Sequence, residues 1–169
     1  MNNKGFTLIE LLATIALLAI LMMMAVPNII GVVNKNRNKT YVEDAKKLVS
    51  LAEYKIRSNS DYKPTSSSGA YCFKMKFLDS SSDNFSSPPG GGCYDNQMSY
   101  VMVTWSNSKL NYKVQLVERK TYNKTTDTCE GNIKAGIKEV EHNDLFNSDA
   151  TKKVTTTGFV TNPTCSLKN

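Results

Sequence analysis

Few residues in this chain are of types that could carry out chemistry. Four cysteines, Cys72, Cys93, Cys129 and Cys165, and a single histidine, His142, are the first candidates. No two cysteines have the C-x2-C or C-x4-C spacing that is typical of zinc ligands. The C-x-x-C spacing of redox-active cysteine pairs is therefore also absent from the sequence. His142 lies in a charged segment, and no G-x-S-x-G element accompanies it. We therefore expect no metal, no cofactor and no enzymatic activity, and we expect His142 to be a surface histidine.

The cysteines indicate a disulfide framework instead. All four lie outside the apolar N-terminal segment, and an even number of cysteines in an exported chain is typical of bridged domains. Two bridges are expected, and four cysteines permit three pairings, which the sequence does not decide. The favoured pairing is Cys72 with Cys93 and Cys129 with Cys165, because it closes the two shortest loops that do not cross.

One carboxylate interrupts the apolar N-terminal segment. Residues 11–26 carry no charge, and with their apolar flanks they reach the roughly 20 residues that span a bilayer. Glu10 is the charged residue inside this segment, and an ionised carboxylate in lipid costs about 2.5 kcal/mol or more unless it has a partner. Glu10 could lie at the headgroup level beside a helix N-terminus. Alternatively, cleavage after Gly5 would expose an amine at Phe6 that could pair with Glu10 of a neighbouring subunit.

The segment Lys4–Leu12, KGFTLIELL, resembles the class III signal of type IV prepilins and pseudopilins. The resemblance implies that a prepilin peptidase removes the leader after Gly5 and methylates the new N-terminus, giving N-methylphenylalanine at Phe6. It implies that Glu10 pairs with the amine of an adjacent subunit during assembly. Pro27 lies where such pilins commonly have a helix-disrupting proline, which would either weaken the helix locally or mark its exit from the membrane.

This resemblance also implies a function and a location. We expect a structural subunit, major or minor, of a type IV pilus that serves adhesion, aggregation or twitching motility. It would lie in the cytoplasmic membrane with its head outside and then in an extracellular pilus. Its partners would be other pilin subunits, the prepilin peptidase, the pilus assembly machinery and membrane lipid. The alternatives are a pseudopilin of a type II secretion or competence DNA-uptake system and a single-pass, membrane-anchored surface binding protein.

Charge gives no further indication of a partner. The net charge of +6 arises from 21 basic and 15 acidic residues that are scattered along the chain. A nucleic-acid site would need a local basic face. DNA or a host surface is a possible partner that the sequence does not indicate.

The expected fold is α+β, a long helix packed on a small antiparallel β-sheet head, as in the type IV pilin fold. One helix is predicted over residues 6–57, transmembrane in its first half. In its second half Tyr41, Ala45, Leu48, Ala52 and Ile56 recur at helical spacing, with Val42 and Val49 beside them, which predicts an amphipathic face.

The chain is about one domain plus an anchor in length. Its expected parts are a leader (1–5), a transmembrane or fibre-core half-helix (6–33), an amphipathic half-helix (34–57) and a disulfide-stabilised head (58–169). Strands are predicted over 70–78, 99–105, 110–118 and 154–160, with the second and third forming a hairpin, and an exposed loop is predicted over 79–92.

Overall fold

The computed structural model describes residues 7–81, 84–85 and 87–168, and the side chains of residues 25–28 lie outside this description. The chain divides into two compact units, Met1–Asn36 and Arg37–Asn169. Helix α1, Leu8–Ser58, contributes to both units. The prediction of one long N-terminal helix is confirmed, with its start at Leu8 and its end one residue later than expected.

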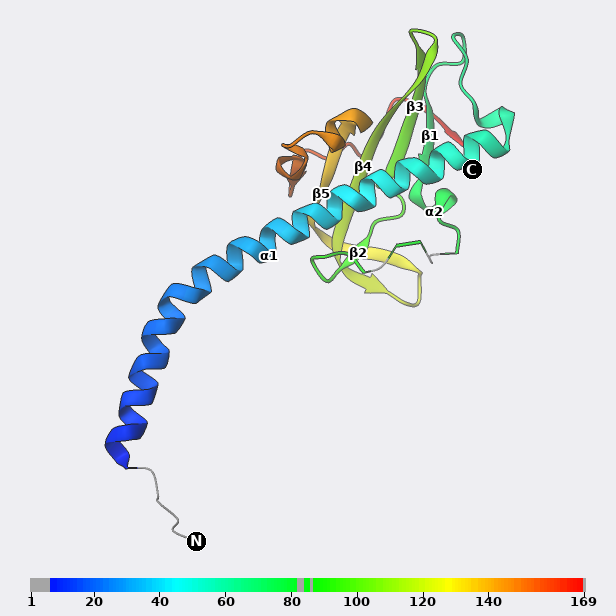
Figure 1. The fold of residues 1–169 in the computed structure, drawn as a ribbon. Coiled ribbons are helices and arrows are strands. Elements are labelled where there is room, and N and C mark those ends of the chain that lie inside the picture. The colour runs from blue at the N-terminus through cyan, green and yellow to red at the C-terminus, as the bar shows by residue number, and fades with distance from the viewer. Residues whose placement is uncertain (1–6, 82–83, 86, 169) are drawn as a thin grey trace. The chain divides into compact units, whose positions relative to one another are not determined.

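In the second unit, the C-terminal part of α1 packs on one β-sheet (Figure 1). The sheet has seven strands in the order β6-β5-β4-β3-β1-β7, and β2 pairs with β4. All pairs are antiparallel except β1 with β7, which is parallel. The α+β class with an antiparallel-rich sheet is confirmed. The strands are β1 Tyr71–Lys74, β2 Cys93–Tyr94, β3 Tyr100–Ser106, β4 Lys109–Asn123, β5 Thr128–Glu141, β6 Val154–Thr155 and β7 Ser166–Lys168.

Short helices complete the second unit. The helical turn η1 (Ser60–Tyr62) follows α1, and α2 (Met75–Leu78) follows β1 directly. Two more turns, η2 (His142–Phe146) and η3 (Ala150–Lys153), connect β5 to β6.

The predicted amphipathic face of α1 forms half of the core. Its seven apolar residues are all buried, at no more than 6% exposure: Tyr41, Val42, Ala45, Leu48, Val49, Ala52 and Ile56. They belong to one hydrophobic cluster with strand residues such as Phe73, Val101 and Leu116. In Figure 1 this part of α1 crosses the face of the sheet over β3 and β4. The 3.6-residue spacing therefore identified the helix face that packs on the sheet.

The predicted hairpin is confirmed as β3 and β4. Ser106 pairs with Lys109, which leaves a loop of two residues, Asn107 and Ser108. Both have positive φ, at 51° and 60°. This is the type I′ geometry, whose twist matches that of the flanking strands.

The strand predicted over residues 70–78 is wrong in its second half. Strand β1 ends at Lys74, and Met75 begins the single turn of α2, which closes when the Asp79 N–H donates to the Met75 carbonyl at 2.8 Å. The helical spacing of Met75 and Leu78 allows both to be buried, whereas a strand would have put them on opposite faces. The alternation in this segment was therefore a misleading signal.

The C-terminal part of the sheet was largely missed. Strand β4 continues to Asn123, beyond the predicted 110–118, and β5 follows over 14 residues in which no strand was predicted. Most of the first half of β5 is exposed, so it lacks the apolar alternation that predicts strands. The strand predicted over 154–160 is only the two-residue β6, and β7 was not predicted.

Two disulfides form, but the favoured pairing is wrong. The structure joins Cys72 to Cys165 and Cys93 to Cys129, with Cα–Cα distances of 5.7 and 5.9 Å. Strand pairing is the reason. The parallel ladder of β1 with β7 brings the C-terminus beside Cys72, while β2 and the start of β5 flank the same strand, β4. Loop length therefore did not decide which cysteines meet.

Removing the two disulfides should have unequal effects. A native bridge in a small exported domain typically contributes about 2 to 5 kcal/mol, and the contribution grows with the logarithm of loop length. The Cys72–Cys165 bridge spans 93 residues and the Cys93–Cys129 bridge spans 36. The double variant Cys72→Ser with Cys165→Ser should thus lose about 0.8 kcal/mol more than Cys93→Ser with Cys129→Ser, from the loop-closure term. Urea unfolding of the full chain in detergent measures both.

Peptide mapping without reduction provides the control. It should recover peptides that link Cys72 to Cys165 and Cys93 to Cys129. A peptide that links Cys72 to Cys93 in the native protein would contradict the structure, and equal losses in the two double variants would contradict the loop-length argument.

The last residue of the predicted loop over residues 79–92 contacts a buried carboxylate, that of Glu118. Glu118 on β4 is fully buried, and its oxygens accept hydrogen bonds from the Tyr41 hydroxyl and, at 2.9 Å, from the Gly92 N–H. Lys134 on β5 lies 3.9 Å from the same carboxylate and also donates to the Gly90 carbonyl. Burial, together with this carboxylate, raises the pKa of Tyr41. Glu118 thus ties α1, the loop and β5 together.

A glycine is required where this loop approaches β4. A Cβ at Gly92 would lie 1.9 Å from the Arg119 carbonyl oxygen, and one at Gly90 would lie 2.4 Å from a Glu118 oxygen. At Gly92 a backbone atom blocks any side chain, so only glycine fits there, whereas the Glu118 side chain would have to move to admit a Cβ at Gly90. Gly92 therefore allows the loop to pack against β4.

Candidate functional site: the N-terminal processing and assembly segment

The first turn of α1 is closed by a reciprocal pair of hydrogen bonds between Thr7 and Glu10. The Thr7 N–H donates to Glu10 Oε2 at 2.9 Å, and the Thr7 hydroxyl donates to the same oxygen at 2.8 Å. In return, the Glu10 N–H lies 3.3 Å from Thr7 Oγ1. This is a capping box, in which an N-cap threonine and the glutamate three residues later satisfy each other's backbone N–H groups.

The capping box gives Glu10 a partner inside its own chain. The helix terminus and a neighbour's amine were the partners expected for Glu10. The T-x-x-E pattern of Thr7 and Glu10, which signals a capping box, is the sequence signal that identifies this third partner. In the sequence, residue 6 directly precedes Thr7. Gly5 and Phe6 lie outside the described residues, so processing there and the pairing of Glu10 with a Phe6 amine stay predictions.

The first unit exposes its large apolar side chains. Among the described residues of α1 from Leu8 to Val33, the large aliphatic and methionine side chains are exposed by 40% or more. Soluble monomers rarely expose continuous apolar surfaces of this kind, so such a surface indicates contact with lipid or protein. The described parts of α1 on either side of residues 25–28 are Leu8–Met24 and Ile29–Ser58. Neither stretch meets the length and hydropathy of a membrane span by itself, whereas the two together meet them.

Pro27 lies within α1, but its side chain lies outside the described residues. Its role in weakening the helix or marking the membrane exit therefore stays a prediction.

His142 is half-buried, not fully on the surface as expected. Its ring packs against those of Tyr112 and Phe146, with centroid distances of 6.2 and 5.0 Å. Burial lowers the pKa of His142. Two aromatic rings contact it, so the geometry around His142 favours a packing role.

Comparison with known proteins bears on the N-terminal segment. Residues 1–26 match the family described as the prokaryotic N-terminal methylation motif. No curated protein and no solved structure matches the chain. The matched residues include Gly5, Phe6 and Glu10, together with the capping box that begins α1. A long N-terminal helix followed by an antiparallel-rich sheet is consistent with the type IV pilin fold. The chain therefore carries, at its N-terminus, the class III signal of the type IV pilin-like proteins.

Proposed function

We propose that this chain is a structural subunit of a type IV pilus. It is cleaved between Gly5 and Phe6, N-methylated at Phe6 and polymerised through the apolar part of α1. The observation that carries the proposal is the methylation motif on a helix whose large apolar side chains are exposed. A prepilin peptidase and other pilin-type subunits are its partners.

The helix suits two successive environments. Its backbone hydrogen bonds are satisfied within the helix, which is the condition for lying in lipid. Its apolar side chains can exchange lipid for neighbouring helices when subunits assemble. Before assembly the subunit lies in the cytoplasmic membrane with its head outside, and after assembly it is part of a fibre on the cell surface.

Four functional segments follow from this proposal. Residues 1–5 form the leader, residues 6–33 the membrane and fibre-core half of the helix, and residues 34–57 the half that packs on the sheet. Residues 58–169 form the head. The two disulfides support an extracellular location, because such bridges persist in oxidising compartments.

Shearing of intact cells tests the pilus role. A pilus subunit should be abundant in the detached fibres, in an amount that rises with fibre yield. A chain that stays with the cells while another pilin fills the fibres would be a pseudopilin or an anchored surface protein, and the proposal would be wrong. A cytoplasmic protein probed in the same fractions controls for lysis.

A further inference from the structure

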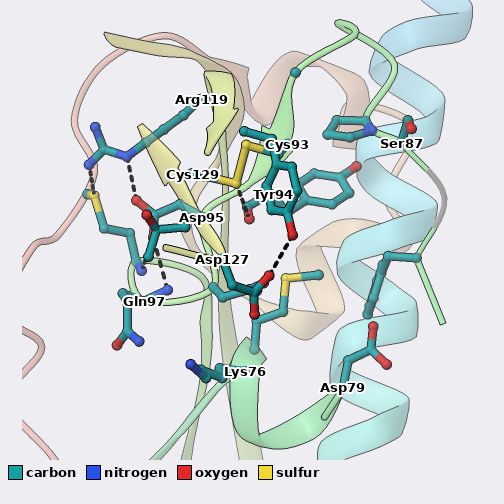
Figure 2. A pocket seen from close by; sticks show the side chains of 18 residues that line it. Lys76, Asp79, Ser87, Cys93, Tyr94, Asp95, Gln97, Arg119, Asp127 and Cys129 are labelled. Carbon is teal, nitrogen blue, oxygen red and sulfur yellow. Dashed lines mark hydrogen bonds and ion pairs between the residues drawn. A yellow bond between two sulfur atoms is a disulfide. The ribbon is translucent and has the colours of Figure 1, made fainter. Parts of the chain in front are cut away.

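A cavity of about 610 Å³ opens in the second unit, beside the Cys93–Cys129 disulfide (Figure 2). Helix α2, strand β2 with the loop after it, and the end of the β4–β5 hairpin contribute its walls. Its volume lies in the range of small-molecule sites, about 300 to 1,000 Å³. The chemistry of the lining decides which class of ligand it suits.

Each of the three guanidinium nitrogens of Arg119, the arginine in the lining, already has a partner. Arg119 Nε donates to Asp95 at 2.5 Å, Nη1 donates to the Gly131 carbonyl at 2.7 Å, and Nη2 lies 3.0 Å from the Met98 sulfur. A phosphate or carboxylate ligand would need a free guanidinium fork or several ammonium groups. Only Lys76 among the lining residues offers a second cation. The cavity is therefore poorly suited to an anion.

Two carboxylates in the lining each have one oxygen engaged by a neighbouring side chain. Asp79 is 7% exposed, and its Oδ1 accepts from the Asn84 side chain at 2.7 Å. Asp127 Oδ1 accepts from the Tyr122 hydroxyl at 2.6 Å. Among the described residues neither Oδ2 atom has a hydrogen-bond partner, so both can accept from a bound donor.

Donors line the same cavity. The Gln97 side chain accepts from Lys74 through Oε1 at 3.0 Å, which leaves its NH₂ group as the donor. Asn96 and the Lys76 ammonium group are further lining donors. In Figure 2, Gln97 and Lys76 lie on one side of the opening and Asp79 on the other. A ligand that spans the cavity would meet acceptors and donors together.

Apolar groups make up the rest of the wall. The ring of Tyr94 is 6% exposed, and Met75 and Met98 also line the cavity, together with the ring of Tyr122. These surfaces suit a ligand with apolar C–H faces between its polar groups. No group of three or more carboxylate, histidine or cysteine ligands occurs in the described part of the chain, so a metal ion is not favoured.

The loop that carries these donors is held in place. Asp95 Oδ1 accepts from the N–H groups of both Gln97 and Met98 at 2.9 Å, while Oδ2 binds Arg119. The disulfide joins the adjacent strand β2 to β5. A fixed loop reduces the entropy that ligand binding would cost.

From this combination we propose that the cavity binds a neutral saccharide of one or two sugar units. Sugar hydroxyls both donate and accept, which matches the Oδ2 atoms of Asp79 and Asp127 and the carboxamide donors, and their C–H faces match the apolar wall. The proposal concerns the head alone and does not depend on how the chain is processed or assembled.

Binding is tested with the full-length chain in lauryldimethylamine oxide, a detergent that contains no sugar. Lactose, maltose and N,N′-diacetylchitobiose serve as probes, each followed by saturation-transfer NMR and by titration calorimetry. At least one should bind. Asp127→Asn and Asp79→Asn should each weaken that binding about tenfold or more, the usual effect of losing a hydrogen bond to a charged group.

Two comparisons make the result decisive. Asp149→Asn, at the N-cap position that precedes η3 and outside the cavity, is the matched control and should leave sugar binding unchanged. Inorganic phosphate and spermidine test the anionic and cationic alternatives. The proposal is overturned if no saccharide binds, if only phosphate or spermidine binds, or if Asp127→Asn in a folded chain binds the sugar as tightly as the unaltered chain.

Discussion

Replacing Glu10 by glutamine should lower the yield of sheared fibres more than tenfold while leaving the start of α1 intact. Glutamine can replace glutamate in a capping box, so the N–H groups of Thr7 and residue 10 stay satisfied. It removes only the negative charge. A Phe6 amine would then lie in an apolar environment without its counter-charge, which costs about 2.5 kcal/mol or more. Immunoblots of sheared fibres, normalised to the membrane-held subunit, measure the yield.

A second variant separates the two roles of Glu10. Thr7→Val removes the hydroxyl of the capping box but keeps the carboxylate. It should cost about 1 kcal/mol of helix stability and leave most assembly intact. If Glu10→Gln gives a normal fibre yield and Thr7→Val gives a low one, Glu10 acts by capping its own helix. That result would contradict the pairing of Glu10 with an amine of another subunit.

Replacing Glu118 by alanine should destabilise the head by roughly 3 kcal/mol. The change leaves the buried Tyr41 hydroxyl and the half-buried Gly92 N–H without their acceptor, and a buried unsatisfied group costs about 1 to 3 kcal/mol. It also leaves a cavity beneath the glycine loop. Urea unfolding of the full chain, followed by the fluorescence of Trp105, measures the loss.

Tyr41→Phe is the matched comparison for Glu118. It deletes one hydrogen-bond donor but keeps the carboxylate and its Gly92 bond, so it should cost only about 1 kcal/mol. The double variant should lose less than the two single losses combined, because the two groups share one interaction. Full additivity would show that Tyr41 and Glu118 are not coupled. A Glu118→Ala loss below about 0.5 kcal/mol would show that this buried network does not stabilise the head.

Sequence periodicity revealed the parts of this fold in which one face is buried. The helix face from Tyr41 to Ile56 and the β3–β4 hairpin followed from it, because each has a regular apolar pattern. The exposed half of β5 has no such pattern and was missed. The disulfide pairing depends on which strands adjoin, in particular the parallel contact of β1 with β7, and chain distance carries no information about that.

The N-terminal processing and assembly segment could be identified from a sequence motif, without any periodicity. The residues Gly5, Phe6 and Glu10 were identified by motif, and the family match over residues 1–26 confirms that resemblance. The cavity in the head could not be predicted, because Asp79, Gln97 and Asp127 come from three separate segments that only the folded sheet brings together. The contact between the glycine loop and Glu118 could not be predicted either, because nothing in the sequence of β4 indicates that this carboxylate is buried and accepts a hydrogen bond from the Gly92 N–H.

Mass spectrometry of the subunit recovered from sheared fibres tests the central claim most directly. Processing as proposed predicts a chain that begins at Phe6, lacks residues 1–5 and carries one added methyl group on its N-terminal amine. Fragment ions of the N-terminal peptide locate that methyl group. A fibre or membrane subunit that retains Met1, or that begins at any residue other than Phe6, would contradict the proposed processing and with it the assembly role of Glu10.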